Sequence, residues 1–167
     1  MNTNILALIA LCNEYCSAVE NCAGSTREEF VASMLRLLPR IYISASDIPQ
    51  ENIQSGGYID GALEEVSYDN VRRNMETVMA DADTYLEVFD DDMKYSDTPI
   101  AATVSESLAD LFQVMYNFLE TVRDAPEELV DEAVAAFAED FYENWSRTLC
   151  NVMRPLNDIR RADLFNY

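Results

Sequence analysis

Apolar residues recur every three to four positions along most of the chain, which is the pattern of helices that each bury one face. Five such stripes are present, within residues 4–22, 27–42, 68–80, 100–122 and 126–152. No alternation with a period of two reaches the length of a strand. The 4 glycines and 5 prolines are too few for the many turns of a sheet-rich fold. The sequence therefore predicts an all-α fold.

The short links between these stripes predict an antiparallel bundle of about five to six helices. Hydrophobic residues make up 49% of the chain, enough for a core, and no change in composition divides it. We therefore expect a single acidic helical domain over residues 1–167. The longest irregular stretch, Ile48–Gly61, predicts a glycine-containing loop between the second and third helices.

Local signals predict several helix boundaries. Thr26 and Glu29 have the spacing of a capping box at the start of the second helix. A short helix is expected at Tyr85–Phe89, and Thr98-Pro99 predicts the start of the fourth long helix. Pro39 is expected to kink or divide its helix, and Pro155 to bend or end the last one.

The charge of the chain is strongly negative, with 31 acidic and 11 basic residues and a net charge of −20. Such a charge repels the phosphates of nucleic acids and anionic membrane surfaces, and it attracts cationic partners. The stretch 87–143 contains 16 acids and two bases, Lys94 and Arg123, whereas 144–167 contains two acids and four bases. We expect an acidic face that meets a basic protein, and no direct binding to nucleic acid or membrane.

The chain contains no histidine, so it lacks the usual general base near neutral pH and the commonest metal ligand. Cys12 and Cys16 lie on the apolar stripe of the first helix, and Cys22 and Cys150 are scattered, which does not fit a four-cysteine zinc site. The apolar run Ile5–Cys12 has no preceding base and no small residue before its cysteine, which argues against export. We expect a cytoplasmic protein with reduced cysteines and without metal or cofactor.

Three functions remain open. The favoured one is a non-catalytic interaction module, and the second is an acidic mimic of nucleic acid that occupies a DNA- or RNA-binding protein. The third is a magnesium-dependent hydrolase of nucleotides or phosphoesters, because Glu127-Glu128-x-x-Asp131-Glu132 and Glu139-Asp140-x-x-Glu143 superficially match the carboxylate pairs of all-helical pyrophosphatases. The first of these runs, however, occupies the first turns of a helix, where acids are favoured without any metal, and no nearby base could hold a phosphate.

The candidate interaction surface is the densest run of negative charge together with the polar start of the fourth helix. Its residues are Asp90, Asp91, Asp92, Asp97, Glu106 and Asp110. Adjacent aspartates repel one another, which costs stability that a purely structural turn need not bear. The simpler alternative is that these acids only end one helix and begin the next. The sequence does not identify the basic partner and does not indicate an oligomeric state.

Three groups of motifs carry a family resemblance. They are Leu38-Pro39-Arg40-Ile41-Tyr42, Asp83-Thr84-Tyr85-Leu86-Glu87-Val88-Phe89-Asp90, and Thr98-Pro99-Ile100 with Ser105-Glu106-Ser107-Leu108-Ala109-Asp110-Leu111-Phe112. With them the chain resembles, over about Leu8–Leu156, a bacterial family of small acidic helical proteins classed as a domain of unknown function. The resemblance implies a compact intracellular helical domain and assigns no catalytic or binding residue. Asp91 stands where many relatives have proline.

Overall fold

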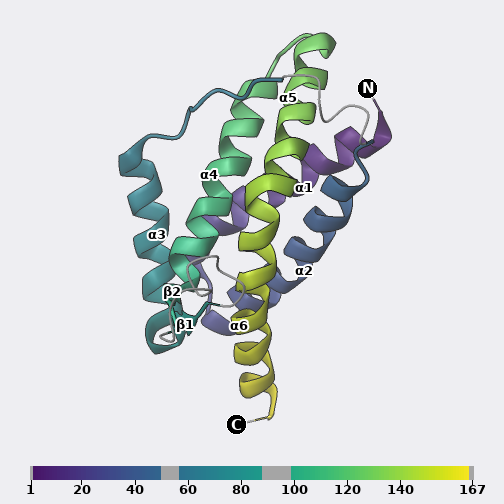
Figure 1. The fold of residues 1–167 in the computed structure, drawn as a ribbon. Coiled ribbons are helices and arrows are strands. Elements are labelled where there is room, and N and C mark those ends of the chain that lie inside the picture. Colours follow the sequence, from purple (N-terminus) through teal and green to yellow (C-terminus); the bar gives the residue numbers. More distant parts are fainter. Residues whose placement is uncertain (1, 50–56, 88–98, 166–167) are drawn as a thin grey trace.

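The structure, a computed structural model, describes residues 2–49, 57–87 and 99–165. The elements within them are α1 (Thr3–Glu20), α2 (Arg27–Ser46), α3 (Glu65–Met79), β1 (Thr84–Leu86), β2 (Ala101–Thr103), α4 (Val104–Val122), α5 (Glu127–Asp140) and α6 (Ser146–Phe165). A π-helical turn, Phe141–Trp145, joins α5 to α6, so that the two form one rod. This rod runs the length of the molecule, with α3 and α4 on one side and α2 on the other (Figure 1). The predicted all-α bundle is confirmed.

The predicted apolar stripes form the core. The fully buried large side chains are Leu8, Tyr15, Phe30, Met34, Leu38, Ile41, Met75, Met79, Phe112, Phe118, Phe137 and Phe141. The rings of Phe118 and Phe137 stack with centroids 4.3 Å apart, which joins α4 to α5. The buried hydroxyl of Tyr15 donates to the carbonyl oxygen of Leu108 at 2.7 Å, which ties α1 to α4. Burying one such side chain stabilises the folded state by about 1.5–3 kcal/mol. The contacts with α1 and α5 hold α4 from two sides.

Prolines do not interrupt the helices as the sequence suggested. Pro39 lies inside α2, which runs unbroken to Ser46, and Pro155 lies inside α6, which continues to Phe165. Of the alternatives expected, that Pro39 kinks or divides its helix and that Pro155 bends or ends the last one, division at Pro39 and an end at Pro155 are wrong. Each proline removes one backbone donor, but the flanking apolar residues, such as Leu38 and Leu156, stay fully buried and hold both halves of the helix in the core.

The segment before α4 is a small sheet rather than helix. β1 pairs antiparallel with β2, with Tyr85 opposite Ala102. The expected short helix at Tyr85–Phe89 is therefore wrong within the part of it that the structure describes. The expected start of α4 at Thr98-Pro99 is also wrong, because the helix begins at Val104. Its N-cap is Thr103, whose Oγ1 accepts a hydrogen bond from the backbone N–H of Glu106 at 3.1 Å.

Buried polar groups fix the junction between this sheet and α4. Asp83, which is only 5% exposed, accepts hydrogen bonds from the backbone N–H of Ser105 at 2.8 Å and from its hydroxyl at 2.6 Å. The hydroxyls of Tyr85 and Ser107 lie 2.9 Å apart and share a hydrogen bond. The Asp83 carboxylate thus satisfies donors at the positive end of the α4 dipole, where negative charge is favoured.

Candidate functional site

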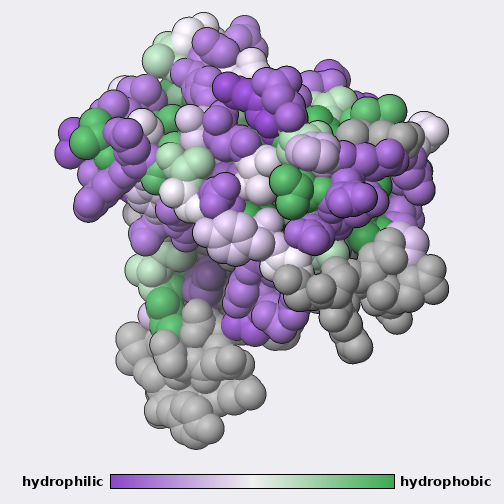
Figure 2. Space-filling view, turned by 90° about the horizontal axis from the view of Figure 1, so that it is seen from above, coloured by the Kyte–Doolittle hydropathy of each residue, from purple (hydrophilic) through white to green (hydrophobic). Residues whose placement is uncertain are grey.

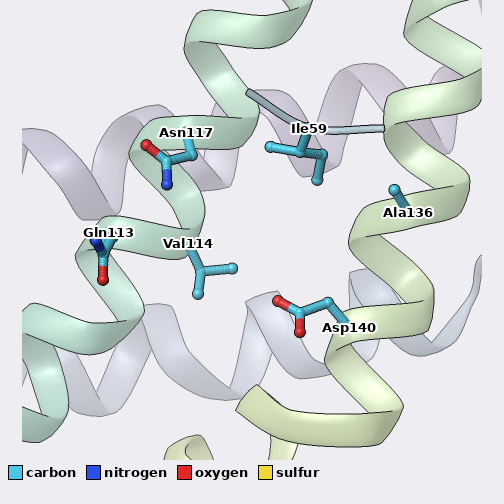
Figure 3. A pocket seen from close by; sticks show the side chains of 6 residues that line it. All are labelled: Ile59, Gln113, Val114, Asn117, Ala136 and Asp140. Carbon is cyan, nitrogen blue, oxygen red and sulfur yellow. The ribbon is translucent and has the colours of Figure 1, made fainter. Parts of the chain in front are cut away.

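A groove lies between α4, α5 and the loop that precedes α3. It encloses about 300 Å³ and is lined by Ile59, Gln113, Val114, Asn117, Ala136 and Asp140. Figure 3 shows Val114 of α4 opposite Ala136 and Asp140 of α5, with Ile59 of the loop between the two helices, and with Gln113 and Asn117 farther round on α4. Its surface therefore combines an apolar floor with two amides and one carboxylate.

The loop that closes this groove is held by hydrogen bonds from its backbone. Oδ1 of Asn117 accepts from the N–H groups of Ala62 and Leu63 at 2.9 and 2.8 Å, and Oγ1 of Thr121 accepts from the N–H of Asp60 at 2.9 Å. At Gly57 a Cβ atom would lie 1.9 Å from the carbonyl oxygen of Glu132 in α5. A glycine is therefore needed for the loop to approach α5 this closely.

A second hollow of about 350 Å³ adjoins the first and shares Gln113 with it. Its other lining residues are Leu63, Glu65, Tyr68 and Asp110. We call the two hollows together, with the lining residues given above, the α4 groove. Three elements supply its carboxylates, Glu65 from α3, Asp110 from α4 and Asp140 from α5, and none of the described residues that line it is a lysine or an arginine.

Electrostatics inside the groove centre on Asp110. The hydroxyl of Tyr68 donates to Oδ1 of Asp110 at 2.6 Å. Partial burial raises the pKa of the Asp110 carboxyl, the hydrogen bond from Tyr68 lowers it, and repulsion from Glu106 raises it, with a net upward shift. Burial and the contact with Asp110 raise the pKa of Tyr68. A cationic group bound here would relieve the repulsion between Asp110 and Glu106.

The structure describes only two of the six residues of the predicted interaction surface. Glu106 and Asp110 both lie exposed on α4, with Asp110 in the α4 groove and Glu106 one turn before it. The other predicted members, Asp90, Asp91, Asp92 and Asp97, lie outside the described residues.

Sequence reasoning did not assign Gln113, Asn117 or Asp140 to the interaction surface, although Asp140 belongs to the carboxylate pattern considered above for a magnesium-dependent hydrolase. Gln113 and Asn117 follow Asp110 at helical spacings of three and seven residues. These positions form a polar edge on an otherwise apolar helix, and that edge is the signal that the sequence offers. The pattern around Asp140 does not indicate this groove, because the position of Asp140 in it depends on how α5 packs against α4.

The groups that could bind metal or act as nucleophiles are dispersed. Glu127 and Glu128 lie exposed in the first turn of α5, and within the described ranges no three His, Cys, Asp or Glu side chains are grouped so that they could hold a metal ion. All four cysteines are free thiols, with Cys150 exposed and the others buried. Burial raises the pKa of Cys12, and it raises that of Cys16 to about 12, which makes both thiols poor nucleophiles.

The face seen from above is largely hydrophilic, with small separate hydrophobic areas (Figure 2). Among the helices that the structure describes, none combines the length and the hydropathy needed to cross a bilayer.

Comparison with known proteins identifies the family. The sequence pattern of the Domain of unknown function (DUF5063) matches residues 1–162. The chain belongs to this family. The family resemblance expected from the motifs is thereby confirmed. A comparison with curated proteins finds no match.

The fold is also similar to a solved structure. The crystal structure of protein BF1032 from Bacteroides fragilis superposes with a TM-score of 0.80 at 25% sequence identity, over 95% of this chain and 93% of that one. The DUF5063 domain here thus has a fold similar to that of protein BF1032 over most of both chains. Neither comparison attaches a ligand or an activity to the α4 groove.

Proposed function

We propose that the protein is a non-catalytic interaction module of the bacterial cytoplasm that binds a basic segment of a partner protein in the α4 groove. The observation that carries this proposal is the position of Glu65, Asp110 and Asp140. These three carboxylates come from three different helices and lie around one groove, and no lysine or arginine is found among the residues that the structure describes in its lining.

The chemistry of the groove suits lysine and arginine side chains. Carboxylate and amide oxygens accept hydrogen bonds from ammonium and guanidinium groups, and Gln113 and Asp110 both line the groove. The apolar residues Ile59, Val114 and Ala136 offer a surface for the aliphatic stems of the same side chains. The net charge of −20 accelerates the encounter with a cationic segment.

The first experiment measures the affinity of a fluorescent lysine- and arginine-rich peptide for two variants with the same change in charge. Gln113→Arg places a cation inside the α4 groove, and Asn74→Arg places one on the exposed surface of α3. We expect the first substitution to weaken binding about tenfold or more, and the second about twofold through the overall field alone.

Equal losses in the two variants would contradict the proposal. They would mean that the peptide responds to diffuse negative charge, which favours the mimic of nucleic acid over a defined groove. In that case a DNA-binding domain should bind the protein in competition with duplex DNA. Magnesium-dependent release of phosphate from nucleotides, retained in Gln113→Arg, would instead support the hydrolase.

A further inference from the structure

The few basic residues of the chain gather on two helices. Seven of the 11 bases belong to α2 and α6, which are Arg27, Arg36, Arg40, Arg147, Arg154, Arg160 and Arg161. The same helices hold only four of the 31 acids. Arg27 near the start of α2 pairs with Asp163 near the end of α6 at 3.3 Å, so the two helices lie antiparallel. They form a side of the molecule away from α3 (Figure 1).

An apolar groove runs between these helices. It encloses about 370 Å³ and is lined by Pro39, Tyr42, Ile43, Leu149, Cys150 and Met153, which we call the α2–α6 groove. Its edge is open to solvent, since Ile43 is 60% exposed and Tyr42 is 39% exposed. The chain segments that line it, 30–46 and 144–157, contain no acidic residue at all.

Cationic side chains stand beside this groove. Arg36 and Arg40 are exposed on α2, with Arg36 three residues before Pro39 and Arg40 three residues before Ile43, on the same helix face. Within the described part of the chain, neither guanidinium forms an ion pair. Two unpaired guanidiniums beside an apolar groove are notable in a chain of net charge −20, because acids to pair with them are abundant elsewhere.

We propose that the α2–α6 groove binds an acidic amphipathic helix of a partner protein. The apolar side of such a helix fits the space between two antiparallel helices, where its ridges pack into their groove. Its aspartates and glutamates then contact Arg36 and Arg40, whose guanidinium groups can form bidentate hydrogen bonds with carboxylates. This surface shares no residue with the α4 groove and attracts the opposite charge, so the two proposals stand or fall separately.

Two other occupants fit the observations less well. A second copy related by a two-fold axis through the groove would set Arg36 and Arg40 against their own counterparts, which places like charges together. An anionic membrane surface is repelled by the net charge of −20, and the apolar residues line a groove rather than a protruding face.

The test uses the full chain and a synthetic peptide with leucines at helical spacing i, i+3, i+4, i+7 and glutamates elsewhere. A scrambled peptide of the same composition is its control. Peptide affinity is measured by fluorescence anisotropy. Occupancy of the groove is measured by the rate at which iodoacetamide alkylates Cys150, the one exposed thiol among the four described cysteines.

Two matched pairs of variants locate the binding. Ile43→Glu alters the groove and Leu129→Glu alters a comparably exposed position of α5. Arg40→Glu reverses a charge beside the groove and Arg73→Glu reverses an exposed one on α3. We expect Ile43→Glu and Arg40→Glu to weaken binding about tenfold and the two controls to change it less than about twofold. The helical peptide should slow the alkylation of Cys150, and the scrambled peptide should not.

Several outcomes would overturn the proposal. Equal losses within either matched pair, or equal binding of the scrambled peptide, would mean that no defined groove is used. Concentration-dependent protection of Cys150 without peptide, with a dimer in sedimentation velocity, would assign the groove to a second copy. Binding to phosphatidylserine vesicles that Ile43→Glu abolishes would assign it to a membrane. Thermal unfolding of each variant tests whether it is folded. If Ile43→Glu does not fold, the comparison of Arg40→Glu with Arg73→Glu decides the outcome.

Discussion

Ser105 is joined to Asp83 by two hydrogen bonds, one from its backbone N–H at 2.8 Å and one from its hydroxyl at 2.6 Å. Both residues are buried, Ser105 to 1% exposure and Asp83 to 5%. The carbonyl oxygen of Asp83 also accepts from the N–H of Val104 at 2.8 Å. Asp83, in the connection that follows α3, therefore determines where α4 begins, and with it the position of the α4 groove.

We expect Asp83→Ala and Ser105→Ala each to lower the free energy of unfolding by about 1–3 kcal/mol, because each leaves a buried polar group without its partner. The double variant should lose less than the sum of the two, by about 0.5–3 kcal/mol, since the second substitution removes the group that the first one orphaned. Urea unfolding of the four proteins measures this coupling. Additive losses would show that the two side chains act independently.

Gly57 and Gly61 provide a matched test of the loop beside the groove. Gly57→Ala forces a methyl group against the carbonyl oxygen of Glu132, whereas an added Cβ at Gly61 meets no atom within 4 Å. We expect the first substitution to destabilise the protein by about 1–3 kcal/mol through overpacking. The second should change stability by less than about 0.5 kcal/mol. Thermal unfolding compares the two, and equal midpoints would mean that the loop does not approach α5 as described.

Stability should fall at alkaline pH through Tyr85. Burial, the largest cause, raises the pKa of Tyr85 from its ordinary value of 10.0 to about 12. Folding therefore favours the protonated phenol. Its contribution is fully present below pH 10, the unfolded pKa, and is lost as the pH rises from there through the folded pKa near 12.

Tyr85→Phe removes this titration. It also removes the hydrogen bond with Ser107, so the variant is expected to be less stable at neutral pH, but its stability should fall less steeply above pH 10. Some slope remains, because burial also raises the pKa of Tyr15 and Tyr68. Urea midpoints at a series of alkaline pH values measure the difference. Parallel curves for the two proteins would contradict the raised pKa of Tyr85.

The helical part of this fold could be predicted because each helix shows its buried stripe within its own sequence. The stripe of α4, for example, includes Leu108, Leu111, Phe112, Met115 and Phe118, all of which are buried. The capping signal at Thr26 was also correct, since its hydroxyl accepts from the N–H of Glu29 at 3.2 Å. Such signals lie within a few residues of one another and do not depend on the rest of the fold.

The sheet could not be predicted in the same way. Strands of three residues are too short to show a period, and Tyr85 pairs with Ala102 across a long stretch of sequence. Thr98-Pro99 has the sequence pattern of a helix start, but α4 does not begin there. The helix begins at Thr103-Val104-Ser105-Glu106, which has the same capping spacing as Thr26–Glu29 and was not used in the prediction. The deciding factor is tertiary, because Asp83 binds Ser105 from outside the helix.

The candidate site was predictable only at Asp110. Charge density pointed to acidic residues, but a groove is formed by packing, which brings Ile59, Gln113 and Asp140 together from distant parts of the chain. The α2–α6 groove could not be predicted from the sequence, because it forms where two helices far apart in the chain pack together, and its flanking Arg36 and Arg40 do not make a dense run of charge.

The central claim is that the protein has two separate docking surfaces of opposite charge. The most direct measurement follows backbone amide chemical shifts of the ¹⁵N-labelled protein by NMR, during separate titrations with the basic peptide and the acidic amphipathic helix. We expect the basic peptide to shift amides of residues 57–63 and around Gln113 and Asn117, and the acidic helix to shift those around Ile43 and Met153. Shifts from both peptides on the same residues, or small shifts spread evenly over the whole protein, would contradict it.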